Sequence, residues 1–234
     1  MIHLQSSTDM NQISSAQSLR CIQANLRHSR LASLSLSKLI LDMKIDIVLI
    51  QEPYVTRRGK SLHIPYFSKH YQVFQNLHQT EFFYGSIILV RNGLRARMLQ
   101  CITENHIVGI EISADPKNLY FLSIYCRPSS CLTDSIRGIN NKPLAFFNHT
   151  VIAIDSNAHN TLWNSTHTDA RGEILETFAS GNNLSILNTD SSDLNLNTSF
   201  IDVTFGGDNI VSRNWSYLSD DSLSDHPLIF FDIQ

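Results

Sequence analysis

Val151-Ile-Ala-Ile-Asp-Ser-Asn-Ala-His-Asn-Thr-Leu-Trp163 is the stretch that decides how this chain of 234 residues folds. Its four leading apolar residues predict a buried strand, and the polar residues that follow predict a loop at the strand's end. Asp155 and Asn157 would then project from a rigid platform onto the rim of a sheet. An ordinary Asx-turn explains this pair on local grounds about as well as chemistry does.

Short runs of β-branched and aromatic residues recur on both sides of this stretch and predict further strands. The predicted strands are Arg20–Asn25, Ile45–Ile50, Gly85–Val90, Ile107–Ile112, Leu119–Tyr125, Val151–Ile154, Leu184–Leu187, Phe200–Phe205 and Pro227–Phe231. Several of them are apolar on both faces. Each sheet should therefore be covered by helices on one side and by another sheet on the other.

Helical periodicity is confined to a few segments. It predicts helices over Leu31–Met43 and Arg171–Ser180, and a third within Thr133–Phe147 that Gly138 and Pro143 break. Many strands with few helices indicate an α/β or α+β sandwich rather than a simple alternation of strand and helix.

The composition limits the classes of function. The chain has 42% hydrophobic and 17% charged residues and a net charge of -3, so a nucleic acid would have to meet a local basic patch. Its four cysteines lack paired spacing, which indicates a reduced intracellular protein. No apolar stretch approaches the ~18 residues of a membrane span, and no secretory signal is visible. We expect a flexible leader over residues 1–18 and one domain over residues 19–234.

Polar side chains stand at the ends of most predicted strands. They are Asn25, Glu52, Tyr125, Asp155, Asn157, Asn188, Asp225 and His226, and Asp202 stands inside the strand predicted over Phe200–Phe205. Each alone has an ordinary explanation, such as a surface carboxylate, a satisfied histidine or a core tyrosine with a wet hydroxyl. Together they form the set that phosphodiester hydrolysis needs. That set comprises carboxylates for a hard cation, a carboxylate or imidazole for the attacking water, and neutral donors for the phosphate oxygens.

In this order the set resembles the endonuclease/exonuclease/phosphatase superfamily, which includes DNase I and the apurinic/apyrimidinic endonucleases. The sharper local motifs are Asp155–Trp163, Arg171-Gly172, Leu187-Asn-Thr189, Ser199-Phe-Ile-Asp-Val-Thr204 and Ser224-Asp-His-Pro-Leu-Ile229. They are similar to the endonuclease domain of non-LTR (LINE-type, R1-like) retrotransposons. The resemblance covers Leu19 to Gln234. It implies a four-layer α/β sandwich of the DNase I type, with two mixed β-sheets packed face to face and helices outside.

The resemblance also implies roles for the acidic residues. Glu52 would hold Mg²⁺, with Mn²⁺ as the alternative, and Asn25 and Asp225 would support that metal site. No Cys/His pair has zinc spacing, and oxygen ligands suit a hard cation. Asp155 would orient and deprotonate the attacking water, and Asn157 would help to hold it.

The remaining matched positions surround the phosphate. His226 would be the catalytic histidine, acting as a base or, when protonated, as a donor to the phosphate. Asp202 would fix its tautomer. Tyr125 and Asn188 would donate to phosphate oxygens.

The reaction implied is nicking of one DNA strand by in-line attack of water, leaving 5′-phosphate and 3′-hydroxyl ends. In this family the new 3′-hydroxyl primes reverse transcription. The implied partners are double-stranded DNA and a reverse transcriptase domain downstream in the same polyprotein. A chromosomal substrate implies the nucleus, while neither a membrane nor an obligate protein partner is indicated.

Contact with DNA requires local positive charge. Arg57, Arg58 and Lys60 lie in a predicted loop over Tyr54–Ser61, just after Glu52, and Arg127 lies two residues after Tyr125. A run of charged residues is most often only a solvent-exposed face. Because this run lies close to the predicted metal site, contact with phosphate is about equally favoured. With little net charge, DNA affinity should be modest and should fall steeply with salt.

The loop after Asp155 carries further signals. Trp163 should anchor this loop by burying its ring, and Arg171-Gly172 should attach it to the next helix. His159 either supports the loop or contacts DNA.

Three alternatives remain open at this stage. An abasic-site repair endonuclease and a phosphoinositide or sphingomyelin phosphodiesterase share the superfamily's chemistry. A catalytically silent DNA-binding module would share only its fold.

Overall fold

The computed structural model describes residues 18–59, 61–77, 85–188 and 200–234. The predicted leader, residues 1–18, therefore lies almost entirely outside the described residues. In the described part of the chain, no helix is both long and apolar enough to cross a membrane.

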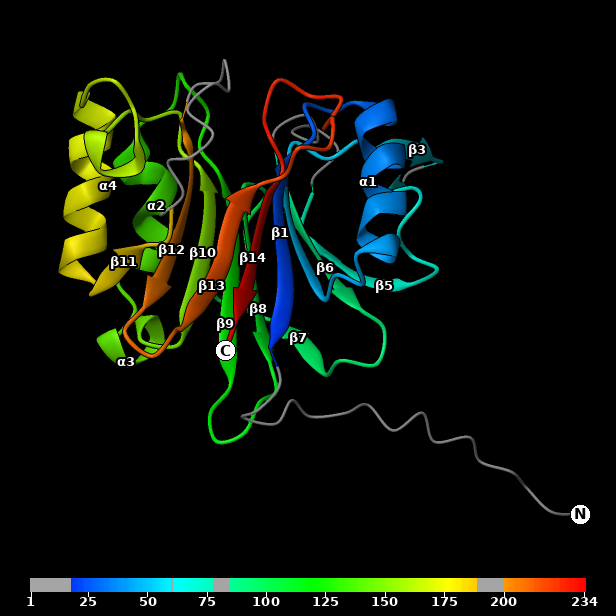
Figure 1. The fold of residues 1–234 in the computed structure, drawn as a ribbon, viewed down its shortest axis with the longest axis horizontal. Helices are drawn as coiled ribbons and strands as arrows, with labels where there is room; N and C mark the ends of the chain where they lie inside the picture. The colour runs from blue at the N-terminus through cyan, green and yellow to red at the C-terminus, as the bar shows by residue number, and fades with distance from the viewer. Residues whose placement is uncertain (1–17, 60, 78–84, 189–199) are drawn as a thin grey trace, which may run out of the picture.

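The core of the fold is two six-stranded sheets (Figure 1). The first sheet has the order β13-β14-β1-β2-β6-β5 and the second has the order β11-β12-β10-β9-β8-β7. In the first, the strands are β1 (Leu19–Asn25), β2 (Ile47–Gln51), β5 (Tyr71–Gln75), β6 (Ser86–Arg91), β13 (Ser212–Tyr217) and β14 (Ile229–Ile233). In the second, they are β7 (Ala96–Met98), β8 (Ile107–Ile112), β9 (Leu119–Tyr125), β10 (Thr150–Asp155), β11 (Leu184–Ile186) and β12 (Asp202–Gly207).

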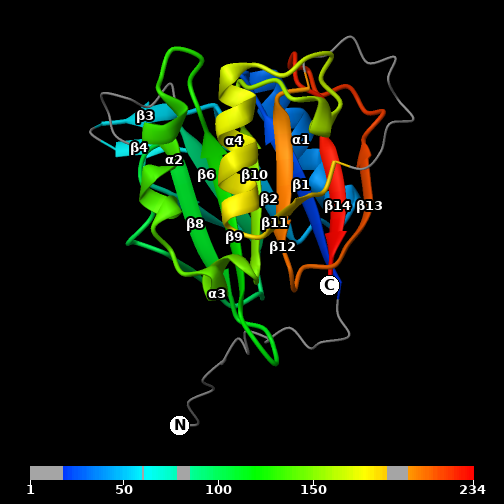
Figure 2. The ribbon, with the colours of Figure 1, turned by 90° about the vertical axis from the view of Figure 1, so that its left-hand side faces the viewer.

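Helices cover the outer face of each sheet (Figures 1 and 2). Helix α1 (Arg30–Asp42) packs on the first sheet, whereas α2 (Leu132–Asn140) and α4 (Ala170–Gly181) lie over the second. The short α3 (Leu144–Phe147) and the 3-10 turn η1 (Thr161–Trp163) connect the strands of the second sheet. Side-chain caps begin the long helices: Ser29 accepts a hydrogen bond from the Ala32 N–H, and Asp169 accepts one from the Gly172 N–H.

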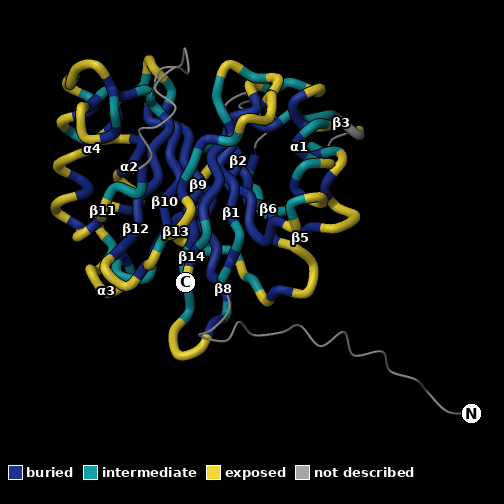
Figure 3. Tube along the Cα trace, viewed as in Figure 1, coloured by how far each residue is buried: buried dark blue, intermediate teal, exposed yellow. Residues whose placement is uncertain are grey.

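Three apolar clusters hold the layers together, and Figure 3 shows the strands of both sheets mostly buried. One lies between the two sheets, one between the first sheet and α1, and one between the second sheet and α2 and α4. The central strands are thus buried on both faces, as their apolar sequences predict. The predicted four-layer α/β sandwich is confirmed.

The strands that the sequence does not predict lie at the margins. They are β5, β7 and β13, all edge strands, and the two strands β3 (Thr56–Arg58) and β4 (Ser61–His63) of a separate ribbon. Edge strands pack on fewer neighbours, so they need no continuous apolar run; β13 reads Ser-Arg-Asn-Trp-Ser-Tyr. The prediction of a loop over Tyr54–Ser61 is therefore wrong, because β3 and the start of β4 lie within that segment.

Two details of the helices also differ from expectation. Gly138 does not break the third helix but lies inside α2, at a cost of only ~1 kcal/mol relative to alanine. The interruption falls at residues 141–143, where Pro143 precedes the first turn of α3.

The strand register places the functional candidates. Parallel pairing sets Asn25 beside Gln51 in the first sheet and Tyr125 beside Asp155 in the second. Antiparallel pairing sets Asp155 beside Asp202. All of these positions lie at the same end of the sandwich, the upper end in Figure 1.

Candidate active site

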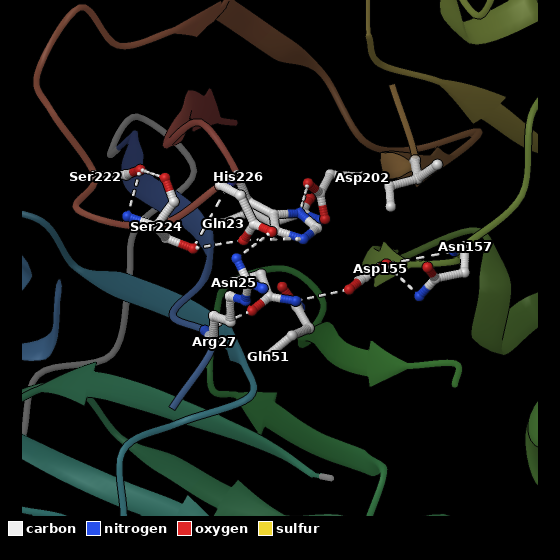
Figure 4. A network of polar contacts seen from close by, with 12 residues as sticks. Gln23, Asn25, Arg27, Gln51, Asp155, Asn157, Asp202, Ser222, Ser224 and His226 are labelled. Atoms are coloured by element: carbon white, nitrogen blue, oxygen red, sulfur yellow. Dashed lines mark hydrogen bonds and ion pairs between the residues drawn. The ribbon is translucent and has the colours of Figure 1, made fainter. Parts of the chain in front are cut away.

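Asn25 joins the two sheets at the centre of the site (Figure 4). Its Nδ2 donates to Asp155 Oδ2 at 2.7 Å and to Glu52 Oε2 at 3.2 Å. Its Oδ1 accepts from the Arg27 N–H at 2.8 Å. One amide therefore holds two carboxylates from different sheets, while its own oxygen faces the backbone.

The surroundings of Glu52 favour its ionised form. It follows β2 in the left-handed backbone region (φ 46°), and its Oε1 lies 3.2 Å from His28 Nε2. Burial favours the neutral acid, but hydrogen bonds from His28, Asn25 and Tyr125 outweigh burial and lower the pKa of Glu52. His28 is a site residue that the sequence analysis missed, although it stands only three residues after Asn25.

Asp155 is a buried carboxylate surrounded by other acids. It is 1% exposed, and its Oδ1 accepts from the backbone N–H and Nδ2 of Asn157 at 3.3 and 3.1 Å. Burial raises the pKa of Asp155 to about 8, and the charges of Asp202 and Glu52 add to that effect. Asn157 has a positive φ of 46°, and its Nδ2 also donates to the Cys126 carbonyl, so its amide is held in place.

His226 and Asp202 form a close pair. Nδ1 of His226 lies 2.6 Å from Asp202 Oδ2. Burial disfavours the imidazolium, but the Asp202 carboxylate outweighs burial and raises the pKa of His226 to about 9. The histidine is therefore protonated at neutral pH. Ligand atoms of Asp155, Asp202 and His226 all lie within 4.8 Å of one another, so the acids and the imidazole share one site.

Asp225 and Asn188 make other contacts than those predicted. Asp225 Oδ2 lies 2.8 Å from Arg27 NH1, and Asp225 Oδ1 lies 4.0 Å from His226 Nε2. Asn188 donates to the Asp202 carbonyl at 3.0 Å and accepts from the Thr204 N–H at 2.8 Å. Asn188 thus supports the strand that carries Asp202. The metal-support role of Asp225 and the phosphate contact of Asn188 stay predictions.

The donor set fits a hard divalent cation. The carboxylates of Glu52 and Asp155 meet at one amide, no thiolate takes part in this cluster, and the buried Asp155 has no arginine among its hydrogen-bond partners in the described part of the chain. Buried carboxylates of like charge are compensated either by protonation or by a cation. Asp155, Asp202 and His226 are the described group whose ligand atoms lie close enough to share an ion, and Glu52 lies next to Asp155 across the Asn25 amide.

The loop after β10 is held firmly. Trp163 is 0% exposed, and its Nε1 donates to the Ala158 carbonyl at 3.2 Å, so its predicted anchoring role is confirmed. The guanidinium of Arg171 donates to the Ser130 and Ser156 carbonyls at 2.6 and 2.8 Å. At Gly172 a Cβ atom would lie 1.9 Å from the His159 carbonyl oxygen, so only glycine fits there.

The remaining DNA-binding candidates are spread around the rim. His159 stacks on His167, with ring centroids 4.9 Å apart. Arg57 is exposed on β3, whereas the Arg58 side chain and all of Lys60 lie outside the described residues. Arg127 lines a hollow of about 310 Å³ together with Tyr125, which makes Arg127 a neighbour of the site.

Comparison with known proteins agrees with this geometry. Residues 119–230 match the family described as Endonuclease-reverse transcriptase. The solved endonuclease domain of TRAS1, a telomere-specific non-LTR retrotransposon, is 27% identical with a TM-score of 0.80, over 93% of this chain and 99% of that one.

More distant structures share the fold alone. An endonuclease/exonuclease/phosphatase from Bacteroides vulgatus is 13% identical with a TM-score of 0.63, over 93% of this chain and 99% of that one. The human Nocturnin catalytic domain is 13% identical with a TM-score of 0.61, over 93% of each chain. The search of curated proteins gives no match.

Proposed function

We propose that this chain, a member of the endonuclease/exonuclease/phosphatase superfamily that resembles a non-LTR retrotransposon endonuclease domain, is a metal-dependent endonuclease that nicks double-stranded DNA. Homology supports nuclease activity of this type. The observation that carries the finer proposal is the Asn25 amide, which joins Glu52 to Asp155 beside the His226–Asp202 pair. This arrangement brings acids for a cation, a base for water and a donor for phosphate to one point.

Asp155 accepts the proton of the attacking water in this proposal. Asn25 donates to one carboxylate oxygen and Asn157 to the other, so the carboxyl cannot rotate. Both donors favour the ionised form, but burial outweighs them and the pKa of Asp155 is about 8 in the metal-free protein. A divalent cation held by Glu52 near Asp155 would favour the ionised carboxylate that can accept a proton, and would neutralise charge on the scissile phosphate and on the leaving 3′ oxygen.

His226 donates to the phosphate rather than accepting a proton from water. With a pKa of about 9, the imidazole carries both protons at neutral pH. Asp202 holds Nδ1, so Nε2 is the nitrogen that can face a phosphate oxygen. Tyr125, whose hydroxyl is bonded to Glu52, adds a neutral donor beside the same carboxylate.

The predicted biological setting follows from the retrotransposon likeness. The nick would leave a 5′-phosphate and a 3′-hydroxyl, and the 3′-hydroxyl would prime synthesis by a reverse transcriptase domain of the same polyprotein. The site of action would be chromosomal DNA in the nucleus. Arg57, Arg127 and His159 are the described candidates for holding the DNA.

Relaxation of supercoiled plasmid in Mg²⁺ tests the proposal. Wild type should convert supercoiled to nicked circles that DNA ligase reseals, and EDTA should abolish the activity. Asp155→Ala and His226→Ala should lose it, whereas the exposed, distant Asp208→Ala and His70→Ala should not.

Several results would contradict the proposal. One is a wild-type protein as inert as both site variants in every divalent metal. Another is a strong preference for an abasic duplex over a plain one, which would favour the repair enzyme instead.

A further inference from the structure

Two glutamines are buried between the sheets directly below the site. Gln23 on β1 is 1% exposed, and Gln51 at the end of β2 is fully buried. Gln23 stands two residues before Asn25, so both side chains point toward the second sheet. Gln51 stands immediately before Glu52. Two polar amides therefore lie in a layer whose core is built from apolar side chains, and buried hydroxyls of Ser123 and Thr204 lie there with them.

Gln51 links the sheets through Ser123. Its Nε2 donates to Ser123 Oγ on β9 at 3.0 Å and to the Ala153 carbonyl on β10 at 3.4 Å. Ser123 Oγ in turn donates to the Ile50 carbonyl on β2 at 3.1 Å. The hydrogen bonds cross from the first sheet to the second and return.

Gln23 makes a second link of the same kind. Its Nε2 lies 3.4 Å from the Ile154 carbonyl on β10 and donates to it, and its Oε1 accepts from Thr204 Oγ1 on β12 at 3.0 Å. Thr204 Oγ1 also accepts from Trp215 Nε1 on β13 at 3.2 Å. This link joins β1 and β13 of one sheet to β10 and β12 of the other.

We infer that Gln23, Gln51, Ser123 and Thr204, here called the amide clasp, are positioning residues that set the spacing between the two halves of the site. Apolar contact is not directional and would let two sheets slide over each other, whereas hydrogen bonds define one separation. A catalytic constellation tolerates errors of only about 0.5 Å.

The position of the clasp supports this role, which rests on the proposed function. At the opposite end the inner layer is apolar, with Leu19, Val90 and Ile112 in the same cluster. The clasp lies only where Glu52 on one sheet must meet Asp155 on the other. Its members are neutral, so it adds no charge to the site. A single apolar substitution leaves a buried partner without its hydrogen bond and so lowers stability, which is why kcat and Mn²⁺ affinity must be compared while every variant is folded.

A pair of substitutions at Thr204 separates positioning from packing. Thr204→Val removes the hydroxyl and keeps the shape, whereas Thr204→Ser keeps the hydroxyl. Gln51→Met breaks the other link. Gln72→Met is the matched control, because Gln72 donates to the Leu94 carbonyl and joins no second sheet.

The expected result is a selective loss of turnover. Thr204→Val and Gln51→Met should lower kcat for plasmid nicking on the order of 10- to 100-fold, with KM for DNA nearly unchanged. Mn²⁺ affinity, measured by titration calorimetry without DNA, should fall in the same two variants. Thr204→Ser and Gln72→Met should match wild type in both measurements. The assay temperature should lie well below the Tm of every protein, so that all of them are folded.

Three results would overturn the inference. In the first, wild type nicks DNA, and Thr204→Val and Gln51→Met keep the same kcat and Mn²⁺ affinity. This result would reject the positioning role and leave the proposed function unaffected. The second is an equal loss in Thr204→Ser and Thr204→Val, which would mark a packing effect. The third is a wild type that neither nicks DNA nor binds Mn²⁺, which would contradict both proposals.

Discussion

Buried acids at the two ends of the sandwich are treated in opposite ways. At the end away from the site, Asp46 is 4% exposed and lies 2.6 Å from Arg91 NH2, and Glu111 is 6% exposed and lies 2.6 Å from Arg97 NH2. At the other end, Asp155 is just as buried, but its neighbours include the acids Glu52 and Asp202, with His226 as the cation beside them. One end pairs each acid with its own arginine, whereas the other gathers several acids around one histidine.

This difference shows where the fold gives up stability. A buried carboxylate with an arginine is compensated, whereas several buried carboxylates in one place repel each other and raise the cost of ionisation. Such a cluster is unfavourable for folding alone. Its presence at the meeting point of two sheets is the strongest physical indication that this end serves chemistry with an added cation.

The largest expected effect is the loss of nicking at the acidic end. Asp155→Asn removes the proton acceptor and keeps the volume of the side chain, so the nicking rate should fall on the order of 10²- to 10⁴-fold. Rates measured on supercoiled plasmid in saturating Mg²⁺ test this. Asp208→Asn, an exposed acid in a distant turn, is the control and should leave the rate unchanged. Comparable rates in Asp155→Asn and wild type would remove Asp155 from the mechanism.

The next effect concerns stability at the paired end. Arg91→Gln leaves the Asp46 carboxylate buried without its cation, which should cost about 3 kcal/mol of unfolding free energy. Urea unfolding of both proteins at pH 7 measures this loss. A variant as stable as wild type at pH 7 would show that the two ends do not differ as described.

The pH dependence of the metal-free protein comes third. The pKa of Asp155 is raised to about 8, so ionising this group costs stability progressively from pH 4 to pH 8. The pKa of His226 is raised to about 9, so its stabilising contribution is complete below pH 6.5 and is lost as the pH rises through 9. Both contributions have the same sign, and Tm in EDTA should fall between pH 5 and pH 9.

Asp155→Asn should flatten this dependence and make the metal-free protein more stable than wild type at pH 8. Added Mg²⁺ should reverse the order, because wild type would then gain stability from binding the cation. A wild-type Tm that rises with pH in EDTA would contradict the description of the acidic end.

The two ends also differ in how far the sequence predicts them. Asn25, Glu52 and Asp155 stand at the ends of apolar strands, and strand pairing brings such positions to one edge, so their meeting could be anticipated. Asp202 is predicted to lie inside a strand, whereas β12 begins at this residue. The Arg91–Asp46 pair could not, because β2 and β6 must first pair before Arg91 and the residue before β2 become neighbours. Long-range pairs depend on register, which residue types alone do not specify.

The same reason explains the site residue and the contacts that the sequence did not reveal. His28 belongs to no sequence motif that marks it as a site residue. It becomes one only because the turn after β1 places its side chain against Glu52. Asp225 belongs to the same motif as His226, yet the turn sends its side chain to Arg27. Gln23 and Gln51 look like polar interruptions of strands until the second sheet supplies Thr204 and Ser123 as partners.

The smallest expected effect is at the second arginine pair. Arg97→Gln should lower Tm by less than Arg91→Gln, because the Arg97 side chain is 74% exposed against 46% for Arg91 and is screened more by solvent. The number of remaining donors does not separate the two acids, since Asp46 keeps a hydrogen bond from the Arg20 N–H and Glu111 keeps one from the Asn118 side chain. Thermal unfolding of both variants, beside Arg213→Gln on the exposed edge strand β13, tests this ranking. A larger loss at Arg97 would mean that burial of the acid alone, and not exposure of the arginine, sets the cost at the paired end.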